Sequence, residues 1–160
     1  MHERILIPLD GSKISECALP YAEDLVSKLS PETKVDVILL HILPKAHPVH
    51  TAGEIVPDVA YDKEQLEIAK KKATEYLNKA GDTLRSKGAA VTAKVEVGDA
   101  SEEIVKTAED INADLIVMST HGRSGISRWA FGSVAEKVLH RGGKVPILIV
   151  RASRTTDISD

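Results

Sequence analysis

A glycine-rich polar segment near residue 120 has the residue types that bind anions. Residues 119–125 read Ser-Thr-His-Gly-Arg-Ser-Gly, and Gly132-Ser133 follows just before an apolar periodic stretch. Glycine lets the backbone approach a ligand closely, and the free N–H groups at a helix start attract negative charge together with the helix dipole. The segment is therefore a candidate phosphate-binding loop. A solvated helix face behind a flexible turn is the plainer alternative.

Local charge agrees with an anion site. Between residues 121 and 144 basic residues outnumber acidic ones by four, although the whole chain has a net charge of −3. The basic residues of this segment are Arg123, Arg128, Lys137, Arg141 and Lys144. Elsewhere the chain is acidic, and aromatic residues make up only 3% of it. A nucleic-acid partner is therefore not expected, since neither a general basic field nor an aromatic stacking platform is indicated.

The other reactive side chains indicate binding more than catalysis. His41, His47 and His50 lie within ten residues, but the one cysteine, Cys17, leaves no thiolate pair for zinc, so we expect histidines without a metal. No nucleophile with an oriented base is recognisable, and Asp10 is the one carboxylate expected at the site. The nucleotide patterns G-x-x-x-x-G-K-[ST] and G-x-G-x-x-G are both missing.

The segments that position these residues alternate between strand and helix patterns. Apolar or alternating runs predict strands at residues 5–9, 35–42, 91–97, 115–118 and 145–150. Apolar residues at spacings of three and four predict helices at residues 15–29, 62–87, 99–111 and from Gly132-Ser133 onward. Three prolines and a glycine predict irregular structure for residues 43–60. This order predicts one α/β domain with a mostly parallel sheet and right-handed crossovers.

A sheet of this kind binds ligands beyond the carboxyl ends of its strands, where the strand order reverses. Three of the predicted strands end in Asp10-Gly11-Ser12, in His41-Ile42-Leu43 and in the segment from Met118 to Gly125. We expect the ligand among these three segments.

The last of these segments resembles the ATP-binding motif of the universal stress protein family. That motif is G-x2-G-x9-G-[ST], and here Ser119 takes the place of the first glycine while Gly122, Gly132 and Ser133 match the rest. Asp10-Gly11-Ser12, Leu39-Leu40-His41-Ile42, Gly98-Asp99 and the run Val145 to Val150 also fit the family. The resemblance covers essentially residues 3–151. It implies a domain over residues 1–151 and a tail over residues 152–160.

The resemblance implies a Rossmann-like fold of the adenine nucleotide alpha hydrolase-like type. Its five-stranded, mostly parallel sheet would have the order 3-2-1-4-5, with helices on both faces. Asp10, Ile42 and Met118 would contact the adenosine, with the backbone of Ile42 facing the base. The implied cofactor-binding residues are Pro8, Leu9, Asp10, Ile42, Met118, Ser119, Gly122, Arg123, Gly132, Ser133 and Val134.

The function implied by the resemblance is that of a cytoplasmic, ATP-binding stress-response regulator with little or no hydrolysis. ATP would bind with Mg²⁺ or Mn²⁺ bridging its phosphates. The apolar strand Val145–Val150 would pair two copies into a homodimer, and residues 43–60 would be where a protein partner reads the nucleotide state. No signal peptide or membrane span is expected. The alternatives are a slow ATPase or phosphotransferase, a nucleotide-free interaction module, and an AMP or cyclic AMP binder.

Overall fold

The apolar runs of the chain form the strands of one parallel sheet. The computed structural model describes residues 1–51, 54–120, 132–141 and 143–152. The sheet has the order β5-β2-β1-β6-β7, and each neighbouring pair is parallel. In chain order this is 3-2-1-4-5, so the predicted sheet order is confirmed. Its strands are β1 (His2–Pro8), β2 (Lys34–Leu43), β5 (Ala90–Val97), β6 (Leu115–Thr120) and β7 (Ile147–Arg151).

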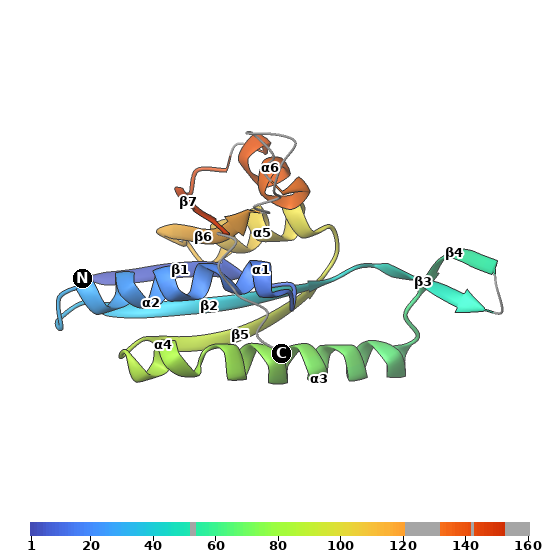
Figure 1. Ribbon diagram of the computed structural model, residues 1–160, viewed down its shortest axis with the longest axis horizontal. Helices are drawn as coiled ribbons and strands as arrows, with labels where there is room; N and C mark the ends of the chain where they lie inside the picture. The colour runs from blue at the N-terminus through green and yellow to red at the C-terminus, as the bar shows by residue number, and fades with distance from the viewer. Residues whose placement is uncertain (52–53, 121–131, 142, 153–160) are drawn as a thin grey trace, which may run out of the picture.

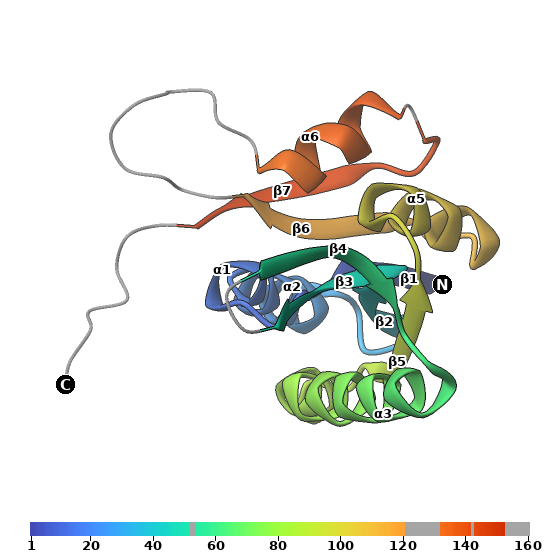
Figure 2. The same cartoon turned by 90° about the vertical axis from the view of Figure 1, so that its right-hand side faces the viewer.

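Helices cover both faces of this sheet (Figures 1 and 2). One face packs against α1 (Lys13–Glu16), α2 (Ala18–Lys28), α3 (Lys63–Ala80) and α4 (Asp82–Ser86), and the other against α5 (Ala100–Asp110) and α6 (Ser133–His140). Successive side chains of a strand point to opposite faces. Accordingly Ile5 and Ile7 of β1 join the core on the α2 side, while Leu6 joins the core on the α5 side.

Local sequence signals set the ends of the helices. The hydroxyl of Ser12 accepts a hydrogen bond from the Ser15 N–H group and caps α1. The helix predicted for residues 15–29 is divided at Cys17 into α1 and α2. The helix predicted for residues 62–87 starts with a capping box at Asp62 and is divided at Gly81 into α3 and α4.

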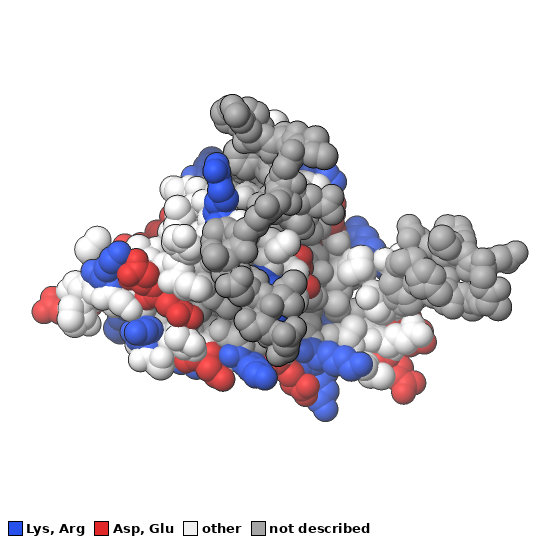
Figure 3. Space-filling view, viewed as in Figure 1, with Lys and Arg blue, Asp and Glu red and all other residues white. Residues whose placement is uncertain are grey.

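Gly81 has a steric reason to be glycine. A Cβ at this position would lie 2.7 Å from Cγ1 of Val91 and 3.2 Å from Cδ1 of Leu39. The helix pair therefore sits directly on β5 and β2. The exposed side of α3 carries both positive lysine and negative glutamate side chains, which lie along the lower edge of Figure 3.

The prediction of irregular structure for residues 43–60 is wrong. These residues contain an antiparallel hairpin of β3 (Ala46–Thr51) and β4 (Glu54–Ala60), which projects beyond the end of the main sheet (Figure 1). Its ladder shifts register between residues 47 and 49, and Pro48 and Pro57 have no partner in it. Proline cannot donate a ladder hydrogen bond, so it is tolerated at such unpaired positions.

The strands around the glycine-rich loop also differ from the predicted bounds. β6 continues through Ser119 and Thr120, which pair with Val150 and Arg151 of β7, whereas the polar character of these residues predicted a turn. β7 begins at Ile147, not Val145. The rest of the loop, residues 121–131, lies outside the described residues, as does the predicted tail after Ala152.

Candidate functional site

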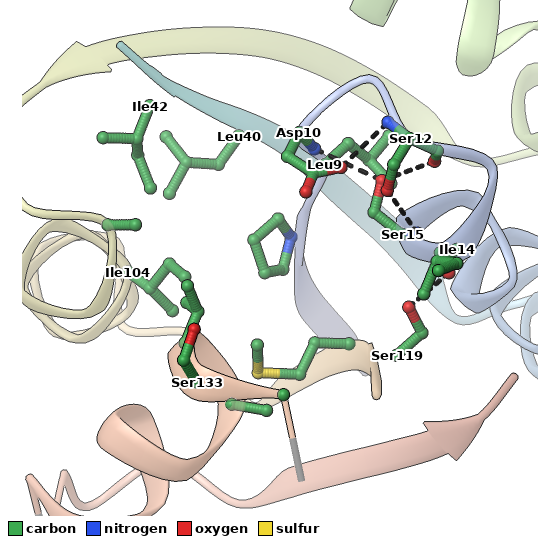
Figure 4. A pocket seen from close by; sticks show the side chains of 16 residues that line it. Leu9, Asp10, Ser12, Ile14, Ser15, Leu40, Ile42, Ile104, Ser119 and Ser133 are labelled. Atoms are coloured by element: carbon green, nitrogen blue, oxygen red, sulfur yellow. Dashed lines mark hydrogen bonds between the residues drawn. The ribbon is translucent and has the colours of Figure 1, made fainter. Parts of the chain in front are cut away.

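A pocket opens at the carboxyl ends of β1, β2 and β6, where the sheet order reverses (Figure 4). The pocket and the open solvent at its mouth together amount to about 680 Å³. Sixteen residues line it: Pro8, Leu9, Asp10, Ser12, Ile14, Ser15, Leu40, Ile42, Ala100, Ile104, Met118, Ser119, Gly132, Ser133, Val134 and Ala135.

Most of the predicted site residues lie around this pocket. Nine of the eleven line it, and the other two, Gly122 and Arg123, lie outside the described residues. Seven further lining residues were not predicted: Ser12, Ile14, Ser15, Leu40, Ala100, Ile104 and Ala135. Leu40 could have been predicted from the sequence, because it lies two positions before Ile42 and therefore on the same face of the strand.

One end of the pocket is polar and is built by the turn from β1 into α1. The Ser12 N–H group donates to Oδ1 of Asp10 at 2.9 Å. The Asp10 N–H group donates to the hydroxyl of Ser15 at 3.3 Å, and that hydroxyl donates to the carbonyl of Ser12 at 2.9 Å. The turn therefore fixes the Asp10 backbone and one carboxylate oxygen.

The charge of Asp10 is stabilised by the same turn. Partial burial raises the pKa of this carboxyl, but hydrogen bonds from Ser12 and Ser15 outweigh burial and leave the pKa below its ordinary value. Asp10 is thus an anionic acceptor near neutral pH. Such a group binds hydroxyl donors well and is a weak general base.

A side chain of β6 reaches this turn from across the pocket. The Ser119 hydroxyl donates a hydrogen bond to the carbonyl of Ile14 in α1 (Figure 4). The link joins the end of β6 to the helix that follows β1, although the two residues are 105 positions apart.

The opposite end of the pocket is apolar. Leu40 is fully buried, and Ile104 and Met118 are nearly so, with Ile42 half-buried beside them. These side chains belong to the core between the sheet and helices α5 and α6. They form a wall suited to a flat, largely apolar ring.

The backbone of Ile42 points toward this end. The ladder between β1 and β2 ends at Leu40, whose carbonyl accepts from the Leu9 N–H group at 2.8 Å. Alternate residues of a strand direct their N–H and C=O groups to the same side. The polar groups of Ile42 therefore point toward the β1 side of β2, beyond the last β1 pair, where a ring with donors and acceptors can meet them.

The N-terminus of α6 forms a third wall. Gly132, Ser133, Val134 and Ala135 line the pocket, and the cap residue Gly132 makes no side-chain capping bond. The first N–H groups of a helix lack partners within it and favour anions. This wall suits a phosphate, and it lies within the basic segment of residues 121–144.

The two helices beside the apolar wall are joined by a polar link. Nε of Arg141, after α6, donates to the buried hydroxyl of Ser101 at 3.0 Å, and that hydroxyl donates to Oδ1 of Asp99 at 2.5 Å. Bonds from Ser101 and the Glu102 N–H group, with the positive charges of Lys137 and Arg141, lower the pKa of Asp99. Arg141 thus supports the α5–α6 wall.

The sequence placed His41 in a group of three neighbouring histidines. Its Nδ1 lies 2.8 Å from the carbonyl of Leu9 and donates to it, and the ring meets Tyr76 edge-on. The Tyr76 hydroxyl donates to Glu16 of α1 at 2.9 Å. His41 thus supports the end of β1. Within the part of the chain that the structure describes, no group of three or more His, Cys, Asp or Glu residues is arranged to hold a metal ion.

Comparison with known proteins identifies the family. The sequence model of the universal stress protein family matches residues 1–151. The chain belongs to the universal stress protein family. Universal stress protein MJ0577 of Methanocaldococcus jannaschii is 31% identical over 160 residues, covering 94% of this chain and 96% of that protein. Universal stress protein YxiE of Bacillus subtilis is 30% identical, covering 94% of this chain and all of its own length.

Solved structures of the family have the same fold. The structure of MJ0577 has a TM-score of 0.66 and 28% identity, and covers 97% of this chain and 99% of its own. Two more distant structures are a universal stress protein in complex with cAMP, with a TM-score of 0.61, and one from Archaeoglobus fulgidus in complex with dAMP, with a TM-score of 0.60. At 24% and 22% identity these two support the fold alone. In the described ranges no helix has the length and apolar character needed to span a membrane.

Proposed function

We propose that this universal stress protein binds ATP or a related adenine nucleotide in the pocket and acts as a nucleotide-dependent regulator in the stress response. One observation carries the proposal. Nine residues that the motif resemblance nominated come from four separate segments of the chain and line a single pocket. Two more distant members of the family are known in complex with cAMP and with dAMP, which are ligands of the same class.

The chemistry of the walls suits the parts of such a nucleotide. The adenine ring would lie against Leu40, Ile42 and Ile104, with the Ile42 backbone facing its edge. Asp10, an anionic acceptor, would take the ribose hydroxyls. The phosphates would lie at the α6 N-terminus, near Ser133, and would extend toward the segment that carries Gly122 and Arg123.

A Mg²⁺ or Mn²⁺ ion would accompany the nucleotide in this arrangement. Asp10 is the one acidic side chain among the described residues that line the pocket, so these residues form no cage for a free cation. Magnesium commonly binds proteins through one or two carboxylates together with substrate phosphates. We therefore assign the ion mainly to phosphate oxygens and water.

Binding without rapid turnover follows from the same residues. The described lining contains no His, Cys or Glu, and the lowered pKa of Asp10 makes its carboxylate a weak base. We propose little or no ATP hydrolysis. Multiple turnovers of Mg-ATP would instead support the slow ATPase or phosphotransferase.

We also propose a cytoplasmic homodimer that forms through β7. This strand lies at the sheet edge next to β6, and Leu148 on it is 41% exposed. An apolar edge strand is an aggregation hazard unless it is paired, and a two-fold axis pairs two identical edges. A protein partner would contact the β3–β4 hairpin. A monomer in sedimentation at micromolar concentration would contradict the dimer.

The first test is to identify the bound ligand. Freshly purified protein is denatured, and the released small molecules are separated by anion exchange and identified by mass spectrometry. Titration calorimetry of the emptied protein with ATP, AMP and cAMP, each with and without Mg²⁺, then ranks the ligands. Absence of any released or titrated adenine nucleotide would favour the nucleotide-free interaction module.

A matched pair of variants tests the site itself. Asp10→Asn removes the charge with little change in shape, and we expect nucleotide affinity to fall about 10- to 100-fold, as for hydrogen bonds to a charged group. Asp24→Asn is the control, because Asp24 pairs with Lys28 on the exposed side of α2 and does not line the pocket. Equal affinities for both variants and wild type would exclude Asp10 from the site.

A further inference from the structure

Ser119 departs from the family motif, and its side chain has a defined partner. Where the motif has glycine, this chain places a hydroxyl that donates to the carbonyl of Ile14 across the polar end of the pocket. A glycine at this position would leave β6 without that link. The substitution therefore adds an interaction to the site.

The helix that receives this hydrogen bond is too short to hold its own position. α1 has four residues, and helices below about 12–15 residues are marginal without outside contacts. Beyond its own backbone bonds, its described supports are the Ser12 cap, the bond from the Cys17 thiol to the Lys13 carbonyl, the Tyr76 bond to Glu16, and the Ser119 bond to Ile14. Of these supports, Ser119 alone comes from β6, which lines the pocket with Met118 and Ser119.

The same short helix positions Asp10. Ser12 donates from its backbone to Oδ1 of Asp10, and Ser15 accepts from the Asp10 N–H group. Any shift of α1 relative to β6 therefore shifts the carboxylate relative to Met118 and Ser119 on the other side of the pocket. Ile14, between these two serines, is the point at which Ser119 holds the turn.

We infer that Ser119 is a positioning residue for ribose recognition: by bracing α1 it holds the Asp10 carboxylate where it meets the sugar hydroxyls, and so it sets the preference for an intact ribose. This role rests on the proposed function, because it requires an adenine nucleotide in the pocket. A Ser119 side chain that merely crowded the phosphates would change affinity according to phosphate number, not according to the sugar.

The test compares two ligands that differ only in the sugar. AMP and 2′,3′-dideoxy-AMP are titrated calorimetrically into wild type, Ser119→Ala and Ser119→Thr. We expect wild type to prefer AMP at least tenfold. Ser119→Ala should reduce this preference about three- to tenfold, the effect of one lost hydrogen bond, with little change for the dideoxy ligand. Ser119→Thr keeps the hydroxyl and should restore most of the preference.

A matched control separates this role from general loss of a serine hydroxyl. Ser27 also donates to a helical carbonyl, that of Glu23, at 2.8 Å, but it lies in α2 away from the pocket. Ser27→Ala should leave the AMP preference unchanged. A loss of affinity in Ser119→Ala that is equal for both ligands would overturn the positioning role.

Hydrogen exchange tests the brace without any nucleotide. The Cys17 N–H group donates at 3.1 Å to the carbonyl of Ile14. The same carbonyl accepts the hydrogen bond from the Ser119 hydroxyl. Exchange of the Cys17 N–H group should be severalfold faster in Ser119→Ala than in wild type. Unchanged exchange would overturn the brace even if the protein binds AMP. A wild-type protein that binds neither ligand would instead overturn the proposed function, and the ribose role with it.

Discussion

The placement of adenine against the apolar wall can be tested by enlarging that wall. Ile104 is 2% exposed and extends from α5 toward Leu40 and Met118. Ile104→Ala should cost about 2 kcal/mol of folding free energy, the lower end of the usual range, since the space opens into an existing pocket. We expect AMP affinity to fall about tenfold, or ~1.4 kcal/mol, through lost contact with the base.

The same substitution should change which base the pocket prefers. N6-benzyl-AMP carries an added ring, which we expect the wild-type wall to exclude and the space left by Ile104→Ala to receive. The ratio of N6-benzyl-AMP to AMP affinity, measured by titration calorimetry, should rise at least tenfold. A raised affinity ratio in Ile104→Ala would therefore show that the base lies against Ile104.

Ile116→Ala is the matched control for this experiment. Ile116 is also 2% exposed and belongs to the same core cluster, but it does not line the pocket. Thermal unfolding should show a comparable loss of stability, with the ligand ratio unchanged. An Ile104→Ala protein with the wild-type ratio, or an Ile116→Ala protein with an equally raised ratio, would refute the placement of the base.

Two further predictions concern the scaffold. Gly81→Ala should destabilise the protein by about 1–3 kcal/mol in urea unfolding, because its Cβ would lie 2.7 Å from Val91, and wild-type stability would show that β5 yields easily. Asp10 has a folded-state pKa below its ordinary value of 3.8, so its charge adds stability above that value and loses it as pH falls through the folded-state pKa. The fall in melting temperature below pH 4 should therefore be shallower in Asp10→Asn, and identical slopes would contradict the assigned hydrogen bonds.

Much of the fold could be predicted because local patterns agree with tertiary packing. The strands starting near Ile5, Val35 and Leu115 are apolar runs, and helices bury them on both faces of the sheet. The apolar sequence and the observed burial therefore both indicate a strand. The hairpin over residues 46–60 was missed because its prolines count as breakers in a residue-by-residue analysis. Only the register of the pair shows that Pro48 and Pro57 occupy unpaired positions.

The candidate site divides in the same way. Asp10, Ile42 and Met118 could be predicted as site residues because the sequence indicates where each strand ends, and a parallel sheet brings these ends together. The role of Ile14 could not, because it depends on a hydrogen bond that forms only when α1 is seated on β6. The role of Ser15 depends on its hydrogen bonds with Asp10 and Ser12, which form only in the folded turn. The bond from Ser119 to Ile14 is the clearest case, since nothing in either local segment indicates the other.

The two ends of the pocket differ in how firmly they are held. Leu40 and Ile104 are parts of the buried core, so the apolar wall cannot move without disturbing the packing of α5 on the sheet. The polar end depends on a four-residue helix and a few hydrogen bonds, which is the kind of segment that opens at low free-energy cost. A nucleotide would therefore meet a preformed base site and would stabilise the Asp10 turn as it binds. The gain in order on binding should accordingly be greatest at α1 and at Glu16 and Tyr76 behind it, and smallest at the base site.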